Sequence, residues 1–339
     1  MKARPLPDQS RFAFIVGAPR CGTTTLASFL KQHPEICFSR VKEPHFFAMH
    51  DMAGMDDAEL KAFVDEEYWS RFFDRCTPGS MPAEGSVTYL YAAERMEPIL
   101  RLWPDAKFII ALRDPLAMLP SLHARLLVNG DEAISDFNKA WDKVEDRALG
   151  RSIPRSAIDA RFLRYDEAGK LGSHVEKFFE AVGRERCHVV LFDDLVADPE
   201  ATYRGICSFL GLEPWPQTKF RQRRQHKDIR FGWLQRLLKR PPKPVRSVMA
   251  GKKYRQRVKP LDAKESRAID AIFRVRKRLL AWNKVPAKRR PLDDRVRQEI
   301  IDRLRGEIIL LSRVIDRDLS HWLGGVPEAD PPRKEARRA

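Results

Sequence analysis

Six consecutive residues carry groups suited to binding a phosphate. In order they are Pro19, Arg20, Cys21, Gly22, Thr23 and Thr24. An apolar run precedes them and a helical pattern follows, so they lie where a strand turns into a helix. The first N–H groups of a helix lack intrahelical partners, and the helix dipole adds positive potential. With the charge of Arg20 and the two threonine hydroxyls, this segment is predicted to bind an anion.

The nucleotide-binding loop G-x-x-x-x-G-K-[ST] limits which anion is expected. Gly17 and Gly22 have the separation of its two glycines, but Thr23 stands where that loop requires lysine. The positive charge comes instead from Arg20, inside the loop. This departure counts against an ATP or GTP hydrolase. A small-molecule kinase with an altered loop stays open as an alternative.

Arg113 and Ser121 form a second candidate phosphate site. Arg113 follows the apolar run KFIIAL, and Asp114 is a good N-cap for the helix after it. Because a helical turn takes about 3.6 residues, Ser121 lies roughly two turns further on and returns to the face near the cap. Arg113 can bind a phosphate bidentately, and Ser121 can donate one more hydrogen bond.

A third candidate is the segment KEPHFF, residues 42–47. Pro44 favours an extended backbone at Glu43. Because alternate residues of an extended segment share a face, Glu43 and His45 are expected to point together. Glu43 is then the first choice for a general base and His45 the second. The alternative is a surface carboxylate at Glu43, paired with Lys42, and a packing role for His45.

The elements that must position these residues alternate along the chain. Strands are expected at residues 11–16, 107–112 and 186–192, each followed by a helix, at 23–31, 115–127 and 199–210. Such alternation predicts an α/β fold, with a central parallel sheet flanked by helices. Open parallel sheets place ligands at the carboxyl ends of their strands. The loop at Gly17 and the residue Arg113 both lie at such ends.

Charge points to an anionic partner or substrate. The 339 residues include 63 Lys and Arg against 47 Asp and Glu, a net charge of +16. Fifteen of these cations and one acid lie between Arg221 and Lys259. We expect one domain over residues 1–325, with a basic insertion at about 221–260, and a disordered tail at 326–339.

The basic insertion contains one expected short helix, Trp233 to Lys239. The insertion could receive an anionic glycan. Its helix could instead rest on a membrane surface, or simply pack. The apolar residues available for membrane contact are Trp233, Leu234, Leu237 and Leu238.

The cysteines favour a reducing compartment. They are Cys21, Cys37, Cys76, Cys187 and Cys207, with no C-x-x-C pair, and an odd count argues against a disulfide framework. We also expect no signal peptide and no spanning helix, which needs roughly 20 apolar residues. The prediction is a cytoplasmic protein, with peripheral membrane contact left open and no expectation for its oligomeric state.

Taken together, these motifs resemble the sulfotransferase family. The loop matches its 5′-phosphosulfate-binding pattern P-[KR]-[SA]-G-T-T, and Arg113 with Ser121 matches its 3′-phosphate site. KEPHFF is similar to a segment of its carbohydrate branch, which includes the heparan sulfate enzymes. Weaker matches at 84–90, 189–195 and 317–322 extend the resemblance over nearly the whole chain, although Val87 replaces the family's proline.

The resemblance implies a P-loop-like enzyme that moves the sulfuryl group of 3′-phosphoadenosine 5′-phosphosulfate (PAPS) to an acceptor hydroxyl by in-line displacement. The implied acceptor is a glycan, a glycolipid or another small molecule, and no metal is expected. A non-enzymatic nucleic-acid-binding protein is the second alternative, which no recognised motif supports. The resemblance assigns PAPS binding to Pro19, Arg20, Cys21, Gly22, Thr23, Thr24, Arg113 and Ser121. It assigns catalysis to Glu43, Arg20 and His45, and the run Lys288 to Arg290 is a further candidate contact for the 3′-phosphate.

Overall fold

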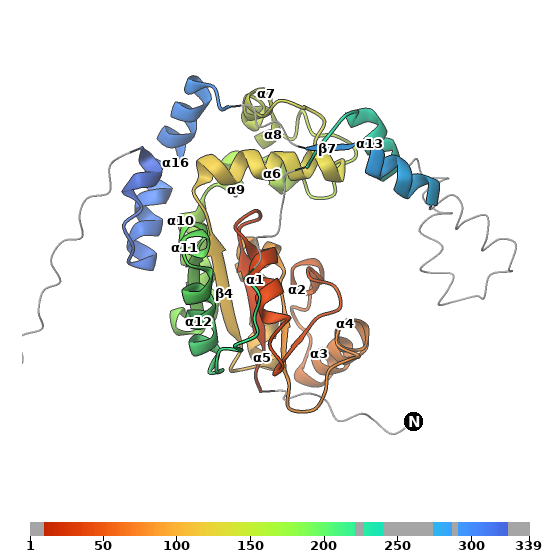
Figure 1. The fold of residues 1–339 in the computed structure, drawn as a ribbon, viewed down its shortest axis with the longest axis vertical. Helices are drawn as coiled ribbons and strands as arrows, with labels where there is room; N and C mark the ends of the chain where they lie inside the picture. Colours follow the sequence, from red (N-terminus) through yellow and green to blue (C-terminus); the bar gives the residue numbers. More distant parts are fainter. Residues whose placement is uncertain (1–9, 221–226, 240–273, 287–290, 325–339) are drawn as a thin grey trace, which may run out of the picture. The chain divides into compact units, whose positions relative to one another are not determined.

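Five parallel strands form the central sheet of the computed structural model, in the order β2-β3-β1-β4-β5 (Figure 1). The structure describes residues 10–220, 227–239, 274–286 and 291–324. The predicted α/β fold with a parallel sheet flanked by helices is confirmed. The strands are β1 (Ala13–Gly17), β2 (Ile36–Phe38), β3 (Met81–Glu84), β4 (Lys107–Leu112) and β5 (Cys187–Leu191).

The chain divides into two compact units. The first comprises residues 1–118, 169–223 and 301–339, and it holds the five-stranded sheet. The second comprises residues 119–168 and 224–300. The predicted single domain over 1–325 stays a prediction, and the predicted tail at 326–339 lies outside the described residues.

The first unit surrounds its sheet with α-helices and short helical turns. Its α-helices are α1 (Thr23–Leu30), α2 (Phe46–Met49), α3 (Asp57–Val64), α4 (Ser70–Phe72), α5 (Glu97–Leu102), α10 (Leu171–Val182), α11 (Phe192–Ala197) and α12 (Pro199–Leu210). One π-helical turn, η1 (Asp65–Trp69), joins α3 to α4. Four 3-10 turns complete the unit: η2 (Val87–Tyr91), η3 (Ala93–Arg95), η5 (Arg184–Arg186) and η6 (Ser320–Leu323).

The second unit is mostly helical, with one small sheet. It contains α7 (Phe137–Trp141), α8 (Val144–Ala148), η4 (Ala160–Leu163), α9 (Tyr165–Ala168), α13 (Gly232–Lys239) and a helical segment at 274–282. Strands β6 (Lys227–Ile229) and β7 (Lys284–Pro286) pair antiparallel. Two helices have residues in both units: α6 (Pro115–Asn129) and α16 (Asp294–Ile315).

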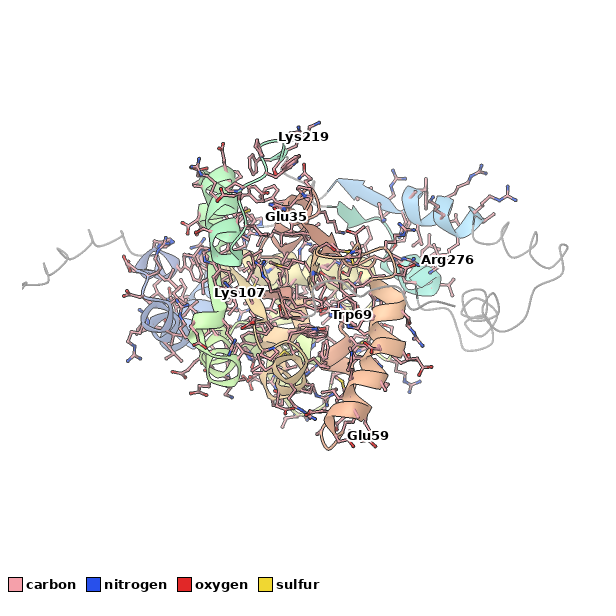
Figure 2. All side chains as sticks on the ribbon, turned by 90° about the horizontal axis from the view of Figure 1, so that it is seen from below. Glu35, Glu59, Trp69, Lys107, Lys219 and Arg276 are labelled. Atoms are coloured by element: carbon pink, nitrogen blue, oxygen red, sulfur yellow. A yellow bond between two sulfur atoms is a disulfide. The ribbon has the colours of Figure 1, made fainter. Side chains whose placement is uncertain are left out.

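An aromatic core supports the sheet. All five residues of β1 are buried, as expected for a strand covered on both faces. Phe14 of β1 lies opposite Phe108 of β4, with ring centroids 5.4 Å apart, and Phe108 meets Phe178 of α10 at 5.3 Å. Trp69 adds a further ring among the packed side chains, 6.0 Å from Trp103 (Figure 2). These rings pack the sheet that carries the candidate site at its strand ends.

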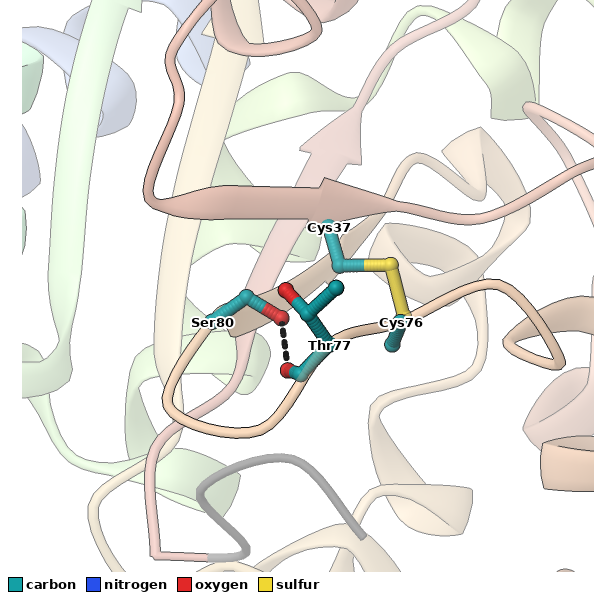
Figure 3. Close-up of a disulfide and its surroundings, with 4 residues drawn as sticks. All are labelled: Cys37, Cys76, Thr77 and Ser80. Atoms are coloured by element: carbon teal, nitrogen blue, oxygen red, sulfur yellow. Dashed lines mark hydrogen bonds between the residues drawn. A yellow bond between two sulfur atoms is a disulfide. The ribbon is translucent and has the colours of Figure 1, made fainter. Parts of the chain in front are cut away.

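A disulfide joins Cys37 of β2 to Cys76 (Figure 3). The expectation of reduced cysteines is therefore wrong for this pair. The two residues are 39 positions apart in sequence, yet their Cα atoms lie 5.4 Å apart, within the range a disulfide spans. Sequence spacing could not show this proximity, because it depends on how the chain folds between the two residues.

Two of the weaker sequence motifs contact each other. Arg317 pairs with Asp194 of α11 at 3.1 Å, and the indole N–H of Trp322 donates to Asp193 at 3.4 Å. Both acids belong to the matched segment at 189–195, and both of their partners belong to the one at 317–322. Helix α16 ends at Ile315, where the next residue, Asp316, adopts a left-handed backbone with φ of 53°.

Candidate active site

The loop between β1 and α1 depends on two glycines. Gly17 has φ of 126°, and a Cβ there would lie 2.5 Å from the carbonyl oxygen of Ala111 in β4. Gly22 has φ of 87°, and a Cβ there would lie 2.6 Å from the side chain of Leu195. Residues other than glycine rarely adopt either backbone conformation. The glycine spacing found in the sequence thus has a steric cause, and it brings the loop close to β4 and α11.

Helix α1 begins with features that favour an anion. Its N-cap is Gly22, which offers no side chain to cap the first N–H groups, and its first turn contains no acid. The Gly22 carbonyl accepts the N–H groups of Thr25 and Leu26, so the helix is fully formed from its start. Thr23 and Thr24 occupy the first turn, as predicted. Positive potential at this helix end is therefore not cancelled by a neighbouring carboxylate of the same turn.

Lys42 is a further candidate site residue, which the sequence reasoning missed. Its Nζ lies 3.2 Å from the Thr23 hydroxyl oxygen, at the first turn of α1, and its side chain is only 17% exposed. The sequence placed Lys42 only as a partner for Glu43. Lys42 in fact supplies an ammonium beside the position where the nucleotide-binding loop has its lysine. The cation is present here, but another segment of the chain provides it.

Arg113 lies at the carboxyl end of β4, beside the loop. Its Nη1 donates to the Arg20 carbonyl at 3.4 Å, and its guanidinium stacks on the Phe192 ring at 4.1 Å. Arg20 has φ of 73°, a backbone conformation that is uncommon for residues other than glycine. These contacts bring two of the predicted PAPS-binding residues together at the expected strand end.

Cys21 and Pro19 contribute to the loop through its backbone. The Cys21 side chain is fully buried, and its Sγ contacts the Pro19 carbonyl oxygen at 3.7 Å. Burial raises the pKa of the Cys21 thiol, despite the charges of Arg113 and Arg20 nearby. This thiol is therefore neutral and unsuited to act as a nucleophile.

Ser121 lies on α6 and is buried. It belongs to the second compact unit, whereas Arg113 belongs to the first. Asp114, the residue just before α6, caps this helix as predicted, accepting the Leu116 N–H at 2.8 Å. The joint role of Ser121 and Arg113 stays a prediction, and the basic run Lys288 to Arg290 lies outside the described residues.

Glu43 and His45 lie near the loop in a different arrangement from the expected one. Glu43 pairs with Lys42 at 2.5 Å, which was the alternative considered for it, and its side chain is 35% exposed. His45 adopts a left-handed backbone with φ of 56°. The expected extended alternation is therefore wrong at His45. Its Nδ1 lies 2.9 Å from the Thr88 hydroxyl instead.

A buried carboxylate, Glu84, anchors the segment that carries Glu43 and His45. Glu84 ends β3 and accepts the Ser86 hydroxyl at 2.7 Å, and Ser86 Oγ accepts the His45 N–H at 2.9 Å. The Gly85 N–H donates to the Lys42 carbonyl at 2.9 Å. Burial raises the pKa of Glu84 to about 7, although the Ser86 hydroxyl and the Lys42 charge partly oppose this. The weaker sequence match at 84–90 begins with this residue, but its burial could not be read from the sequence.

The site gathers groups that bind anions. Backbone N–H groups, threonine hydroxyls and the cations of Lys42 and Arg113 suit a ligand that carries phosphate or sulfate. Within the described ranges, no three His, Cys, Asp or Glu side chains are placed to share a metal ion.

None of the described helices is long and apolar enough to cross a membrane.

Comparison with known proteins gives a family match over this region. The model of the sulfotransferase family matches residues 13–217. Carbohydrate sulfotransferase 15 of Mus musculus is 20% identical over 254 residues, covering 59% of this chain and 44% of that protein. Heparan sulfate glucosamine 3-O-sulfotransferase 3B1 of the same species is 26% identical over 206 residues, covering 59% and 46%. This chain thus spans about half the length of these curated relatives.

A solved structure shares the fold over a longer range. The crystal structure of a sulfotransferase from Alicyclobacillus acidocaldarius superimposes with a TM-score of 0.59 at 23% sequence identity. The alignment covers 94% of this chain and 99% of that one. The sheet and helices described above therefore form a sulfotransferase fold.

Proposed function

This chain belongs to the sulfotransferase family, and on that premise we propose that it transfers the sulfuryl group of PAPS to an acceptor hydroxyl. The observation that carries this proposal is the convergence of Lys42 and Thr23 at the start of α1, with Arg113 beside the same loop. PAPS carries a phosphosulfate and a 3′-phosphate, and the donor set fits such a ligand. It combines N–H groups, a hydroxyl and cations, with no acid in the first turn of α1.

The residues of the loop bind and neutralise the donor. PAPS supplies the sulfuryl group and a bisphosphate leaving group. Lys42, Arg20 and the first N–H groups of α1 stabilise the negative charge that develops on the leaving oxygen. Arg113, at the end of β4, is assigned to the 3′-phosphate. These groups are held in place before the reaction, so little reorganisation is needed.

Glu43 acts on the acceptor. As the new sulfur–oxygen bond forms and the old one breaks, the acceptor hydroxyl loses a proton, which Glu43 takes up. Its side chain is partly exposed, so a substrate can reach it, and its ion pair with Lys42 places it beside the loop. His45 is the second choice, because Thr88 already contacts its Nδ1.

The acceptor we propose is a carbohydrate hydroxyl, on a glycan or a glycolipid. Two observations support this choice: the KEPHFF segment at 42–47 and the names of the two mouse relatives. The cytoplasmic location stays a prediction. The Cys37–Cys76 disulfide is a bond that a reducing compartment disfavours.

The donor assignment can be tested by nucleotide binding. Calorimetry should show that adenosine 3′,5′-bisphosphate binds more tightly than 5′-AMP, and that Arg113→Ala removes most of this preference. A lost charge-assisted contact should cost about 1.5–3 kcal/mol. Arg186→Ala is the control, since Arg186 lies at the amino end of β5, away from the loop. Equal losses for both nucleotides, or tighter binding of ATP, would contradict the assignment.

A further inference from the structure

An exposed apolar surface lies on two helical segments of the second unit, α13 and 274–282. The residues that form it are exposed and have aromatic or aliphatic side chains. We refer to these residues together as the apolar surface. They are Phe231, Trp233, Leu237, Val275, Leu279 and Trp282, each between 38% and 62% exposed. Phe231 directly precedes α13, and the other five lie on the two helical segments. Single exposed apolar residues are common, but six gathered in this way are not.

Contacts within the unit hold α13 so that Trp233 and Leu237 face outward. Gln235 is fully buried, and its side-chain amide donates to the Val128 carbonyl at 2.5 Å. Residues two positions before and after Gln235 are rotated by about 200° along the helix. Trp233 and Leu237 therefore project from the side opposite the buried one, and they are 62% and 48% exposed.

The second helical segment is joined to α13 by described contacts. Arg276 donates to the Leu238 carbonyl at 2.7 Å, and Asn283 bonds to Gln235 at 3.1 Å. The Phe231 and Trp282 rings stack with centroids 5.9 Å apart. Val275, Leu279 and Trp282 recur at the spacing of one helix face. Figure 2 shows side chains near Arg276 extending outward from this segment.

Positive charge surrounds the apolar surface. Residues 229–239 and 274–285 contain eight Lys or Arg and no Asp or Glu. The cations are Arg230, Arg236, Lys239, Arg274, Arg276, Lys277, Arg278 and Lys284. Amphipathic helices with this composition, rich in Lys and Arg around exposed Trp and Leu, bind the surface of anionic bilayers.

We propose that the apolar surface docks this protein onto an anionic lipid bilayer. The exposed aliphatic side chains favour a lipid bilayer over a soluble polyanion as the ligand. An anionic glycan would be attracted by the cations but would gain nothing from Leu237, Leu279 or Val275. A bilayer uses both, because the apolar groups enter its interface while the cations meet the headgroups. This docking is independent of the loop at α1 and goes beyond sulfuryl transfer.

Vesicle sedimentation tests the proposal with the full chain. The protein should pellet with vesicles of phosphatidylcholine and phosphatidylglycerol and much less with phosphatidylcholine alone, at about 0.1 M salt. Trp233→Ala with Leu237→Ala should lower the bound fraction at least about fivefold. Leu149→Ala with Ile158→Ala is the control, since both residues are 68% exposed in the same unit. Circular dichroism and nucleotide binding should be unchanged in both variants.

Three outcomes would overturn the proposal. The first is wild-type protein that stays in the supernatant with anionic vesicles. The second is a Trp233→Ala, Leu237→Ala variant that pellets as the wild type does. The third is binding to a soluble sulfated polysaccharide that depends on Trp233 and Leu237 while vesicles are not bound, which would assign the surface to a glycan. Loss of sulfuryl transfer alone would bear on the proposed function and not on docking.

Discussion

Lys42 and Glu43 are adjacent in sequence but serve different partners. The Lys42 ammonium reaches Thr23 at the start of α1, while the Glu43 carboxylate is partly exposed beside it. In the proposed function, Lys42 adds positive charge for the donor and Glu43 offers a base for the acceptor.

Removing the Lys42 charge should weaken donor binding. Lys42→Met keeps the aliphatic stem but loses a charge-assisted contact, so affinity for adenosine 3′,5′-bisphosphate should fall by about 1.5–3 kcal/mol. Lys31→Met is the matched control, because Lys31 lies at the other end of α1, with its ammonium over Phe38. Calorimetry that finds the same affinity in Lys42→Met and wild type would remove Lys42 from the donor site.

Glu43→Gln should slow turnover without weakening donor binding. The substitution keeps the shape of the side chain but removes its basicity, so kcat should fall on the order of 10²–10⁴. Donor affinity should stay the same or rise slightly, because a negative charge beside Lys42 is lost. Initial rates at saturating donor measure the effect. If kcat stays near normal, Glu43 is not the base, and His45→Ala becomes the decisive variant.

Glu84 should make stability depend on pH. Its pKa is raised from 4.5 to about 7 in the folded protein, so the folded state holds a proton that the unfolded state releases. The contribution of Glu84 to the free energy of unfolding is therefore fully present below about pH 4.5. It falls by about 3 kcal/mol as the pH rises toward 7.

Urea unfolding at pH 5, 6, 7 and 8 measures this loss. Glu84→Gln stays neutral and can still accept the Ser86 hydroxyl, so its free energy of unfolding should lack this decline with pH. Glu94→Gln, at an exposed carboxylate, should follow the wild type. Parallel pH profiles for Glu84→Gln and wild type would show that Glu84 is ionised throughout.

The sequence predicted the loop residues better than their surroundings. Arg20, Gly22 and Thr23 could be placed in the loop and the first turn of α1 because those positions depend on local backbone and helix geometry. Lys42 and Glu84 could not, because their roles arise where β3, α1 and the segment at 42–47 meet. His45 was misjudged for the same reason: its left-handed backbone is tied to Ser86 by a bond between segments distant in sequence.

At the scale of elements, long and strongly patterned segments were predicted well. β4 and α12 have the expected bounds, and α1 differs by one residue at its end. β2 and β3 were missed, since they have three and four residues and β3 contains Pro82. Segments this short show no reliable periodicity. They become strands because the sheet beside them supplies hydrogen-bond partners.

The junction between β1 and β4 should tolerate no side chain at Gly17. Gly17→Ala would place a Cβ 2.5 Å from a backbone oxygen of β4, which cannot move as a side chain can. We expect a loss of about 3 kcal/mol or more in the free energy of unfolding. Gly79→Ala is the control, since its φ is also positive but nothing lies within 4 Å of the added Cβ, and strain alone should cost about 1 kcal/mol. Equal losses in the two variants would rule out the steric argument.

At the scale of the whole molecule, charge gave less information than the arrangement of motifs. A net charge of +16 suits a glycan, a nucleic acid or an anionic membrane equally. Motifs spread between residues 19 and 322 restricted the choice, because each has a defined place in one fold. Two of them, at 189–195 and 317–322, pair through Arg317 and Asp194.

Sulfuryl transfer itself is the claim to test most directly. Wild-type protein, isotope-labelled PAPS and a panel of glycan and glycolipid acceptors should be incubated with a chelator, and products read by mass spectrometry. We predict labelled sulfate on an acceptor hydroxyl, with a rate within about twofold of that without chelator, and almost none with Glu43→Gln. The same incubation is repeated with ATP in place of PAPS. Phosphate transferred from ATP to an acceptor, with a loss of about tenfold or more on chelation, would contradict the account and favour a kinase.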